Sequence, residues 1–368
     1  MRFPEFQGEW EKCKLGELAV KVGSGSTPKG GNAVYTTSGH CFVRSQNVGM
    51  GHLILNDIAY IDESTHQKQK STELRTNDVL LNITGASIGR TALATEEING
   101  GNVNQHVCII RTNGNVEPSY ICDYIQTSKI QKYIQSLQTG GSREGLNFEQ
   151  IRSFPINIPT VEEQVKIAKL LSLINERIAT QSKLIEKLES LIKGIAQKIV
   201  RCNKPNVRLS ECLECKSSTL QESDVYEQGT YPVYGANGIV GYLDNYNAES
   251  EAVYIIKDGS GVGTVSYVTG KCSATGTLNT LQAKDGYSLQ YFYYLLKVFN
   301  FEPYKTGMAI PHIYFKDYGN ALFFCPSYTE QLQYARLFFA IDSKLSAEQN
   351  IKTNISLQKQ YLLREMFI

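Results

Sequence analysis

Pro159-Thr160-Val161-Glu162-Glu163-Gln164 begins a long segment with helical spacing, and Pro326-Ser327-Tyr328-Thr329-Glu330-Gln331 begins a second one 167 residues later. From these points onward the spacing holds without a gap, so that Ile174 matches Ile341 and Leu188 matches Ile355. Solenoid repeats have periods of roughly 20 to 50 residues, so this repeat is of another kind. It indicates a duplicated module of domain plus helix, and such a pseudo-symmetric molecule suits a target with two related halves.

Two apolar seams define the expected helices. Residues 162–200 contain no proline and one glycine, Gly194. Their apolar residues recur mostly in alternating steps of three and four, at Ile167, Leu170, Ile174, Ile178, Ile185, Leu188, Ile192, Ile195 and Ile199. This spacing predicts one helix of about 39 residues, or roughly 58 Å. Residues 329–367 repeat the seam with Leu337, Ile341, Leu345, Ile351, Ile355, Leu362 and Met366.

An apolar stripe on a helix has to be buried, and the partner of each stripe is expected to be the other stripe. Each helix follows a similar globular region, so a two-fold relation between the modules predicts antiparallel helices. Two ordinary core helices in one large domain are the alternative, but segments about three times the average helix length argue against it.

The globular regions repeat less strictly than the helices. Residues 14–18 resemble 208–212 at an offset of 194, and residues 79–89 resemble 253–263 at 174. The offset is 171 between residues 120–125 and 291–296, and 167 by Thr139-Gly140 and Thr306-Gly307. The helices therefore stay in register while the globular regions differ in length. This pattern indicates two domains that share a frame and recognise different things.

Strand and helix patterns alternate within each globular region. Residues 79–83 and 252–256 are apolar and β-branched and end at glycine-rich turns, which predicts strands. Residues 120–137 and 288–299 have helical spacing. The expected fold is α+β, with two similar globular domains joined by two long antiparallel helices. We place the first domain at residues 1–158, the central helix at 159–203, the second domain at 204–325 and the C-terminal helix at 326–368.

Composition restricts the function classes. The 368 residues allow two or three domains, and 37 Lys+Arg against 36 Asp+Glu leave no polybasic or acidic tail, although local basic clefts remain possible. Among nine scattered cysteines, Cys212-x-x-Cys215 has no second pair at zinc-ligand spacing, which favours reduced cytosolic thiols. Met1–Glu5 lacks a signal-peptide core, and no apolar run approaches about 18 residues. We therefore expect a soluble, cytoplasmic protein without membrane partners.

Several motifs carry a family resemblance that covers essentially the whole chain. They are Gly25-Ser26-Thr27-Pro28, residues 82–90 (Asn-Ile-Thr-Gly-Ala-Ser-Ile-Gly-Arg), and Pro-x-x-x-Glu-Gln before each long helix. Tyr234-Gly235-Ala236-Asn237-Gly238 and Gly259-Ser260-Gly261-Val262-Gly263 form a shorter second copy. Together they resemble the specificity subunit of a type I restriction–modification system. In one departure, Lys216-Ser217-Ser218-Thr219 stands where the first region has its Thr-Pro turn.

The resemblance implies two target-recognition domains, each reading one half of a bipartite site in double-stranded DNA. It further implies that the helices dock two modification (methyltransferase) subunits, and that restriction (motor-nuclease) subunits join for cleavage. S-adenosylmethionine, ATP and Mg would then belong to those partner subunits, and we expect no cofactor or metal in this chain.

Catalytic motifs are missing from the sequence, which agrees with this expectation. An adenine amino-methyltransferase is expected to carry an Asn/Asp-Pro-Pro-aromatic motif, and this chain has no Pro-Pro dipeptide. It also has no G-x-x-x-x-G-K-[ST] phosphate loop. None of its five histidines stands four residues from another with a glutamate between them. We predict no catalytic residue. Two alternatives stay open: a divergent fused methyltransferase or nuclease, and a coiled-coil adaptor that binds no nucleic acid.

Candidate DNA contacts follow from residue chemistry, because Arg and Lys read guanine while Asn and Gln read adenine. Polar side chains in turns of the first region are Lys29, Arg44, Gln46, Asn47, Asn82, Thr84, Ser87, Arg90, Asn104, Gln105, His106 and Arg143. Those of the second region are Tyr234, Asn237, Lys257, Ser260, Lys271, Thr275, Thr277, Asn279 and His312. Each could contact a base or a phosphate, or could only satisfy a turn in solvent.

Overall fold

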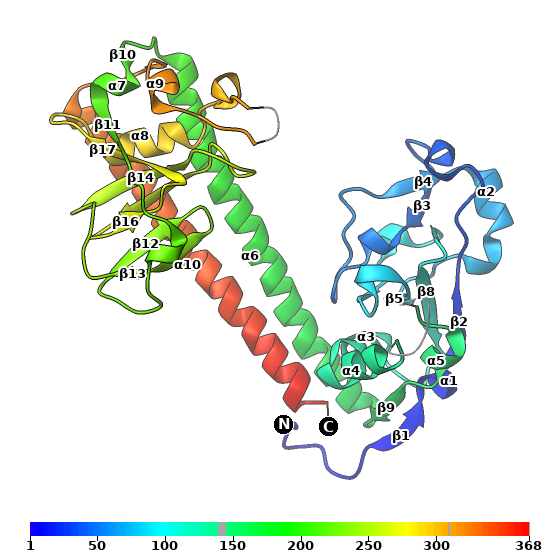
Figure 1. The fold of residues 1–368 in the computed structure, drawn as a ribbon. Coiled ribbons are helices and arrows are strands. Elements are labelled where there is room, and N and C mark those ends of the chain that lie inside the picture. Colours follow the sequence, from blue (N-terminus) through cyan, green and yellow to red (C-terminus); the bar gives the residue numbers. More distant parts are fainter. Residues whose placement is uncertain (139–144, 308–309, 368) are drawn as a thin grey trace. The chain divides into compact units, whose positions relative to one another are not determined.

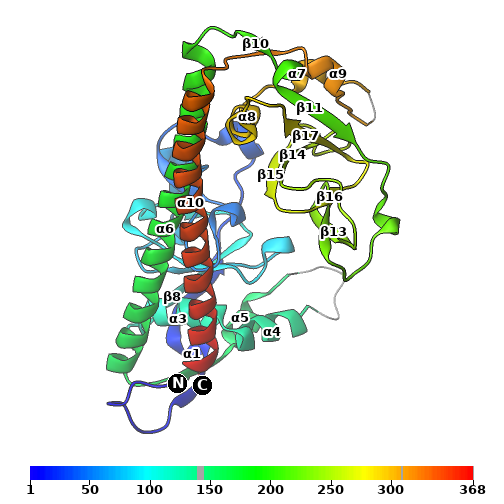
Figure 2. The ribbon, with the colours of Figure 1, turned by 90° about the vertical axis from the view of Figure 1, so that its left-hand side faces the viewer.

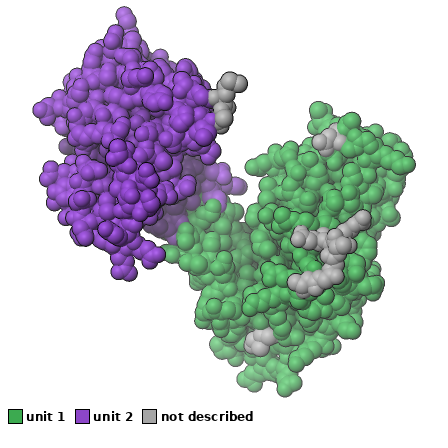
Figure 3. Space-filling view, in the orientation of Figure 1, with its two compact units in different colours: residues 1–181, 351–368 green, residues 182–350 purple. Residues whose placement is uncertain are grey.

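The structure is a computed structural model that describes residues 1–138, 145–307 and 310–367. It forms two compact units, coloured separately in Figure 3. The first comprises residues 1–181 with 351–368, and the second comprises residues 182–350. Each unit therefore contains one globular region and a part of both long helices.

The first unit is built on one larger sheet and two smaller ones. The antiparallel four-stranded sheet has the order β2 (Ala19–Ser24), β8 (Val107–Thr112), β5 (Val79–Asn82) and β6 (Thr91–Leu93). A three-stranded sheet has the order β4 (Ala59–Ile61), β3 (His40–Val43) and β7 (Asn102–Val103), with β3 parallel to β7. β1 (Glu11–Lys14) pairs with β9 (Pro155–Ile158).

The second unit repeats this topology strand for strand. Its four-stranded sheet has the order β11 (Leu213–Ser217), β17 (Leu278–Ala283), β14 (Glu251–Ile256) and β15 (Val265–Thr269). Its three-stranded sheet has the order β13 (Gly238–Leu243), β12 (Tyr231–Gly235) and β16 (Ser273–Ala274), again with one parallel pair, β12 and β16. β10 (Val207–Arg208) pairs with β18 (Leu322–Phe323). The predicted repeat and the α+β class are confirmed.

Short helices cover the sheets of both units. The first unit has α1 (Leu15–Leu18), α2 (Glu63–Lys68), α3 (Pro118–Gln126), α4 (Ser128–Ser136) and α5 (Phe148–Arg152), and the second has α7 (Leu209–Cys212), α8 (Leu289–Leu296) and α9 (Phe315–Tyr318). The helical spacing of residues 120–137 thus belongs to two helices. They are separated at Thr127, whose extended backbone (ψ 147°) stops α3 and whose side chain caps α4 by accepting from Ile130 N.

The two long helices are α6 (Val161–Cys202, 42 residues) and α10 (Tyr328–Glu365, 38 residues). In the first unit Ile167 and Leu171, near the start of α6, share a core with Leu362 at the end of α10. In the second unit the end of α6 shares a core with Phe338 and Leu345 of α10. The helices are therefore antiparallel within each unit, as Figures 1 and 2 show. No described helix combines the length and apolar character that a membrane crossing requires.

The seam of α10 differs from its prediction at two positions. Leu337 is 47 % exposed and Ile351 is 38 % exposed, so neither is a core residue. Phe338 takes the inward place beside Leu337: it is fully buried, and its ring stacks on Tyr294 with centroids 4.4 Å apart. The Phe338 ring thus fills the space in the domain core beside Tyr294 of α8.

A glutamine clamps the start of each long helix to its own domain. In the first unit Gln164 Oε1 accepts from Glu117 N (2.9 Å) while Gln164 Nε2 donates to Pro159 O (2.9 Å). In the second unit Gln331 Oε1 accepts from Ser288 N (2.9 Å) and Gln331 Nε2 donates to Pro326 O (3.0 Å). Both glutamines are about 1 % exposed. The repeated Glu-Gln motif therefore ties the first turn of a neighbouring short helix, α3 or α8, to the long helix.

Replacing Gln331 with alanine should lower the free energy of unfolding by about 1–3 kcal/mol, because the buried Ser288 N–H would lose its acceptor. Urea unfolding followed by circular dichroism would measure the change. Gln333→Ala is the matched control, since Gln333 lies on the same helix with an exposed side chain, and its effect should stay within about 0.5 kcal/mol. Equal losses in both variants would contradict the clamp.

Candidate nucleic-acid interface

Three polar segments of the first unit meet at one edge of its sheets. They are the turn 44–47 after β3, the turn 83–90 after β5, and residues 104–106 before β8. Asn104 N donates to Val43 O (3.0 Å), and Ile83 N donates to His106 O (3.0 Å). Strand pairing thus brings together three of the predicted segments that are far apart in the sequence.

A chain of polar side chains runs along this edge. Gln105 Oε1 accepts from Thr27 N (2.9 Å) and from the Thr27 hydroxyl, which directs Gln105 Nε2 toward His106 Nε2 (3.1 Å). His106 Nε2 is then the acceptor, so the ring proton sits on Nδ1 and faces Thr84 Oγ1 (2.7 Å). The exposed Gln105 keeps a second amide hydrogen that this chain does not use. Such a preorganised amide is suited to bond a base edge.

Buried asparagines of the candidate set support the turns and do not face solvent. Asn47 is 1 % exposed, accepts from Arg44 N (2.9 Å) and donates to Ile54 O (2.9 Å). Asn82 is fully buried and donates to Ser45 O (2.8 Å), which joins the turns after β3 and β5. Asn104 is 7 % exposed and accepts from His106 N (3.1 Å). These side chains have a structural role in the turns, and their contact with DNA stays a prediction.

Arg44 and Gln46 both hydrogen-bond to one aspartate. Arg44 Nη2 lies 3.1 Å from Asp57 Oδ2, and Gln46 Nε2 lies 2.6 Å from the same oxygen. The Arg44 side chain is only 19 % exposed, whereas that of Asp57 is 80 % exposed. The structure therefore holds the predicted arginine inward and presents the acid outward.

The remaining candidates of the first unit differ in exposure. Arg90 and Lys29 are exposed, and no ion pair involves either of them within the described part of the chain. Ser87 is half-buried in the same turn as Arg90. Arg143 lies outside the described residues. Arg90 is thus an exposed cation on a turn with a fixed backbone, because Arg90 N donates to Ser87 O (3.1 Å).

The second unit forms an equivalent edge from different residues. Thr275 N donates to Tyr234 O (2.8 Å), Lys257 N donates to Thr277 O (3.0 Å), and the bridge Asp258–His312 matches Thr84–Gly145 of the first unit. The matching bridges show that Gly145 of the first unit corresponds to His312 of the second. Half-buried Lys257 and His312 and exposed Ser260 therefore gather at this edge. Thr275 is buried, and its hydroxyl group shares a hydrogen bond with that of Thr277 (2.8 Å).

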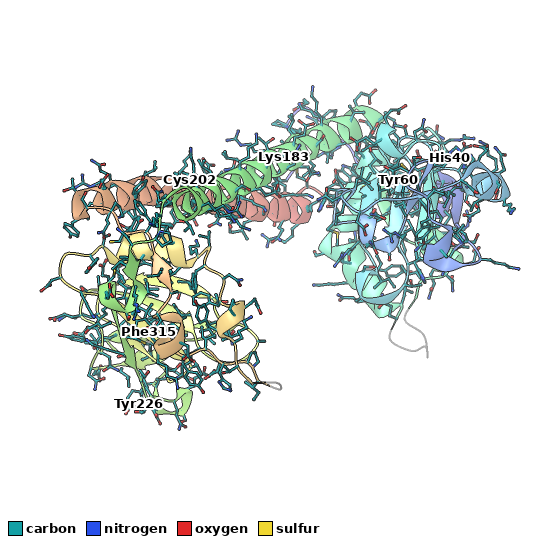
Figure 4. All side chains as sticks on the ribbon, turned by 90° about the horizontal axis from the view of Figure 1, so that it is seen from above. His40, Tyr60, Lys183, Cys202, Tyr226 and Phe315 are labelled. Carbon is teal, nitrogen blue, oxygen red and sulfur yellow. The ribbon has the colours of Figure 1, made fainter. Side chains whose placement is uncertain are left out.

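The β12–β13 hairpin carries two further candidates of this edge. Asn237 is exposed at its two-residue turn, where Gly238 has the left-handed φ of +106°. Burial raises the pKa of the Tyr234 phenol, so it remains a neutral donor. Tyr226, which pairs with Tyr242 of β13, lies on the side of the unit away from α6 (Figure 4).

The region of the Thr-Pro turn, which only the first unit has, differs between the units. In the first, a Cβ on Gly25 would stand 1.8 Å from Val103 O, so this turn needs glycine. In the second, Lys216–Thr219 border a cavity of about 450 Å³ that Asn247, Tyr254 and Thr280 also line. The two edges share a frame and present different shapes.

Lys271 and Asn279 do not join the edge of the second unit. Lys271 Nζ lies 4.5 Å from the ring centroid of Tyr246 and 6.0 Å from that of Tyr231, beside the beginning of β12. Asn279 is 4 % exposed in the middle of the sheet and donates to the Tyr318 hydroxyl (3.0 Å). Asn279 therefore makes a hydrogen bond inside the core. Lys271 makes a cation–π contact with Tyr246.

Comparison with known proteins bears on both units. A model of the type I restriction modification DNA specificity domain matches residues 7–190 and again residues 204–357. The chain belongs to this family. The two specificity domains correspond to the two copies of the fold, each with a long helix that follows it.

Two curated relatives are specificity subunits. The putative type I restriction enzyme MjaX specificity subunit of Methanocaldococcus jannaschii is 24 % identical over 201 residues, which are 53 % of this chain and 46 % of that protein. The type I restriction enzyme EcoBI specificity subunit of Escherichia coli is 22 % identical over 161 residues, which are 43 % and 33 % of the two chains. The matched segments therefore span less than half of either relative.

Solved structures share the fold of the two specificity domains. The S subunit of a type I restriction–modification system from M. genitalium aligns over 100 % of this chain and 99 % of its own, with a TM-score of 0.68 and 17 % identity. A chain from a structure on complex assembly and conformational transition of the type I R-M system aligns over 98 % and 97 %, with a TM-score of 0.55 and 17 % identity. The likeness establishes the architecture of two α+β domains with long antiparallel helices.

Arg90→Ala should weaken binding to all DNA sequences alike and should reduce the slope of log K against log salt by about one, if Arg90 contacts a phosphate. Titrations of the full chain with duplex DNA at several salt concentrations would measure both effects. Lys12→Ala provides the control, because Lys12 is an exposed cation on β1, away from the polar edge. An unchanged slope in Arg90→Ala would show that Arg90 is a solvated surface residue without a phosphate contact.

Proposed function

We propose that the chain is the DNA-recognition and assembly subunit of a type I restriction–modification complex, and that it has no catalytic activity of its own. Each specificity domain reads one half of a bipartite site in double-stranded DNA through its polar sheet edge. The observation that supports this most directly is that the same topology places a different set of exposed donors and acceptors at the same edge of each unit. A shared frame with different contents suits two different half-sites.

The long helices are proposed to dock two modification subunits, with restriction subunits joining for cleavage. Repetition supports a count of two, because the Glu-Gln clamp at Gln164 recurs at Gln331. Under this proposal S-adenosylmethionine, ATP and Mg are bound by the partner subunits, and the complex acts in the cytoplasm. A coiled-coil adaptor without nucleic acid would have no use for two matching polar edges.

Replacing residues 1–158 with the first domain of another family member should change one half of the recognised sequence and leave the other half unchanged. Each polar sheet edge consists of residues from one unit only, so an exchange of one domain leaves the residues of the other edge unchanged. Mapping of methylated adenines across the genome, in cells with the original, the exchanged or no gene, would test this. A change in both halves would show that the domains do not read separately.

Lengthening α6 and α10 together by one turn each should change the separation of the half-sites by about 5.4 Å of helix and leave both half-sites as they are. Matched insertions are needed because the two seams pack against each other in each unit. The same methylation map would report the new spacing. An insertion in α6 alone serves as the control and should impair folding, since it would break the register of the seams.

A further inference from the structure

Asp57 is an exposed acid at an edge that should attract nucleic acid. It follows the turn 44–47 in the chain and precedes β4, and Arg44 Nη2 donates both to Asp57 Oδ2 (3.1 Å) and to Asp57 O (2.6 Å). Gln46 Nε2 donates to Asp57 Oδ2 (2.6 Å), and Asn47 Nδ2 lies 3.3 Å from Asp57 O. Every side chain of the 44–47 turn that was a DNA candidate thus converges on this one residue.

Arg44 is turned inward in this structure, so it is poorly placed to read a base itself. Its guanidinium lies over the ring of Tyr35, 5.5 Å from the centroid, and Arg44 Nε is buried without a hydrogen-bond partner in the structure. Both contacts to Asp57 use Nη2, and the side chain is 19 % exposed. To bind a guanine, Arg44 would have to break its salt bridge with Asp57 and lose its contact with the Tyr35 ring.

The same geometry suits Asp57 for reading a base. The nearby guanidinium offsets the negative charge that DNA phosphates would otherwise repel. The contacts to Arg44 and Gln46 fall on Oδ2, so Oδ1 of this 80 % exposed side chain is not used by them. A carboxylate oxygen in the major groove accepts hydrogen bonds from exocyclic amino groups and finds no partner on guanine O6 or N7.

We propose that Asp57 is a specificity-determining residue of the first domain, which accepts a hydrogen bond from an exocyclic amino group in the major groove, cytosine N4 or adenine N6. Arg44 is its positioning residue, and Gln46 holds the same carboxylate oxygen, Oδ2, so that Oδ1 stays available. This inference rests on the proposed function of the chain as a DNA reader. It adds an acid that base-reading rules for basic and amide residues do not find.

The test uses the full chain in complex with its modification subunits and selects bound sequences from a randomised duplex pool. Asp57→Ala should lose discrimination at one base pair of the first half-site by about 10- to 100-fold, with the other positions unchanged. The base that wild type prefers there distinguishes cytosine from adenine. Arg44→Ala should lose discrimination at the same base pair, and the double variant should be no worse than either single one.

Two controls separate base reading from general effects. Glu97→Gln removes another exposed acid of the same domain and should leave every base preference intact. Asp57→Asn keeps the size of the side chain and one acceptor, so it remains informative if Asp57→Ala unfolds, and it should show a smaller loss at the same position. Thermal unfolding of each variant would confirm that the domain is folded.

Different outcomes would contradict the role of Asp57 and the proposed function of the chain. If Asp57→Ala tightens binding to all sequences alike and keeps every preference, Asp57 is a solvated acid and the inference is wrong. If Arg44→Ala changes a different base pair from Asp57→Ala, Arg44 reads a base itself and the inference is equally wrong. A wild-type complex without any sequence preference would overturn the proposed function, and the role of Asp57 with it.

Discussion

Burial of the two apolar seams is the constraint on which the rest of the structure depends. A helix of some forty residues with one apolar stripe is not stable alone in water, because its stability comes from packing. In each unit the stripe of α6 meets that of α10, and both enter the core of the globular domain. The long helices are therefore part of the domain cores and not only a spacer between the domains. Each domain includes the helix ends in its own core, and the buried glutamines Gln164 and Gln331 fix where the entry occurs.

Most of this frame could be predicted from the sequence because it depends on periodicity. A seam in steps of three and four, repeated at a constant offset, specifies helices, their length and their mutual packing. Prediction was less accurate where a single position depends on its neighbours. Phe338 displaces Leu337 from the core since Tyr294 offers it a stacking surface, and Thr127 divides one helical pattern into two helices. Neither effect is visible in spacing alone.

The candidate interface was predictable in its segments but not in its individual side chains. Turns rich in Asn, Gln, Thr and Arg do meet at one edge of each unit, because strand pairing brings their ends together. Within those turns the same residue types serve two purposes, and burial decides between them. Asn47 and Asn82 satisfy backbone groups, whereas Gln105 remains exposed. No sequence pattern indicated Asp57 as a DNA contact, because electrostatic attraction to DNA favours basic residues. The proposal for Asp57 rests on its contacts with Arg44 and Gln46.

The core of the first unit also has a consequence for synthesis of the protein. Leu362, Leu363, Met366 and Phe367 pack beside Tyr120 and Tyr124, and the amino group of Met1 donates to Glu365 O. At 5 to 20 residues per second, about 9 to 34 s pass between translation of residue 181 and residue 351. The apolar face of the first unit that these side chains cover therefore stays exposed until residues 351–367 have been made. Transiently exposed apolar surface of this kind favours aggregation, and a chain that stops within α10 would lose part of the core of the first unit as well as the end of that helix.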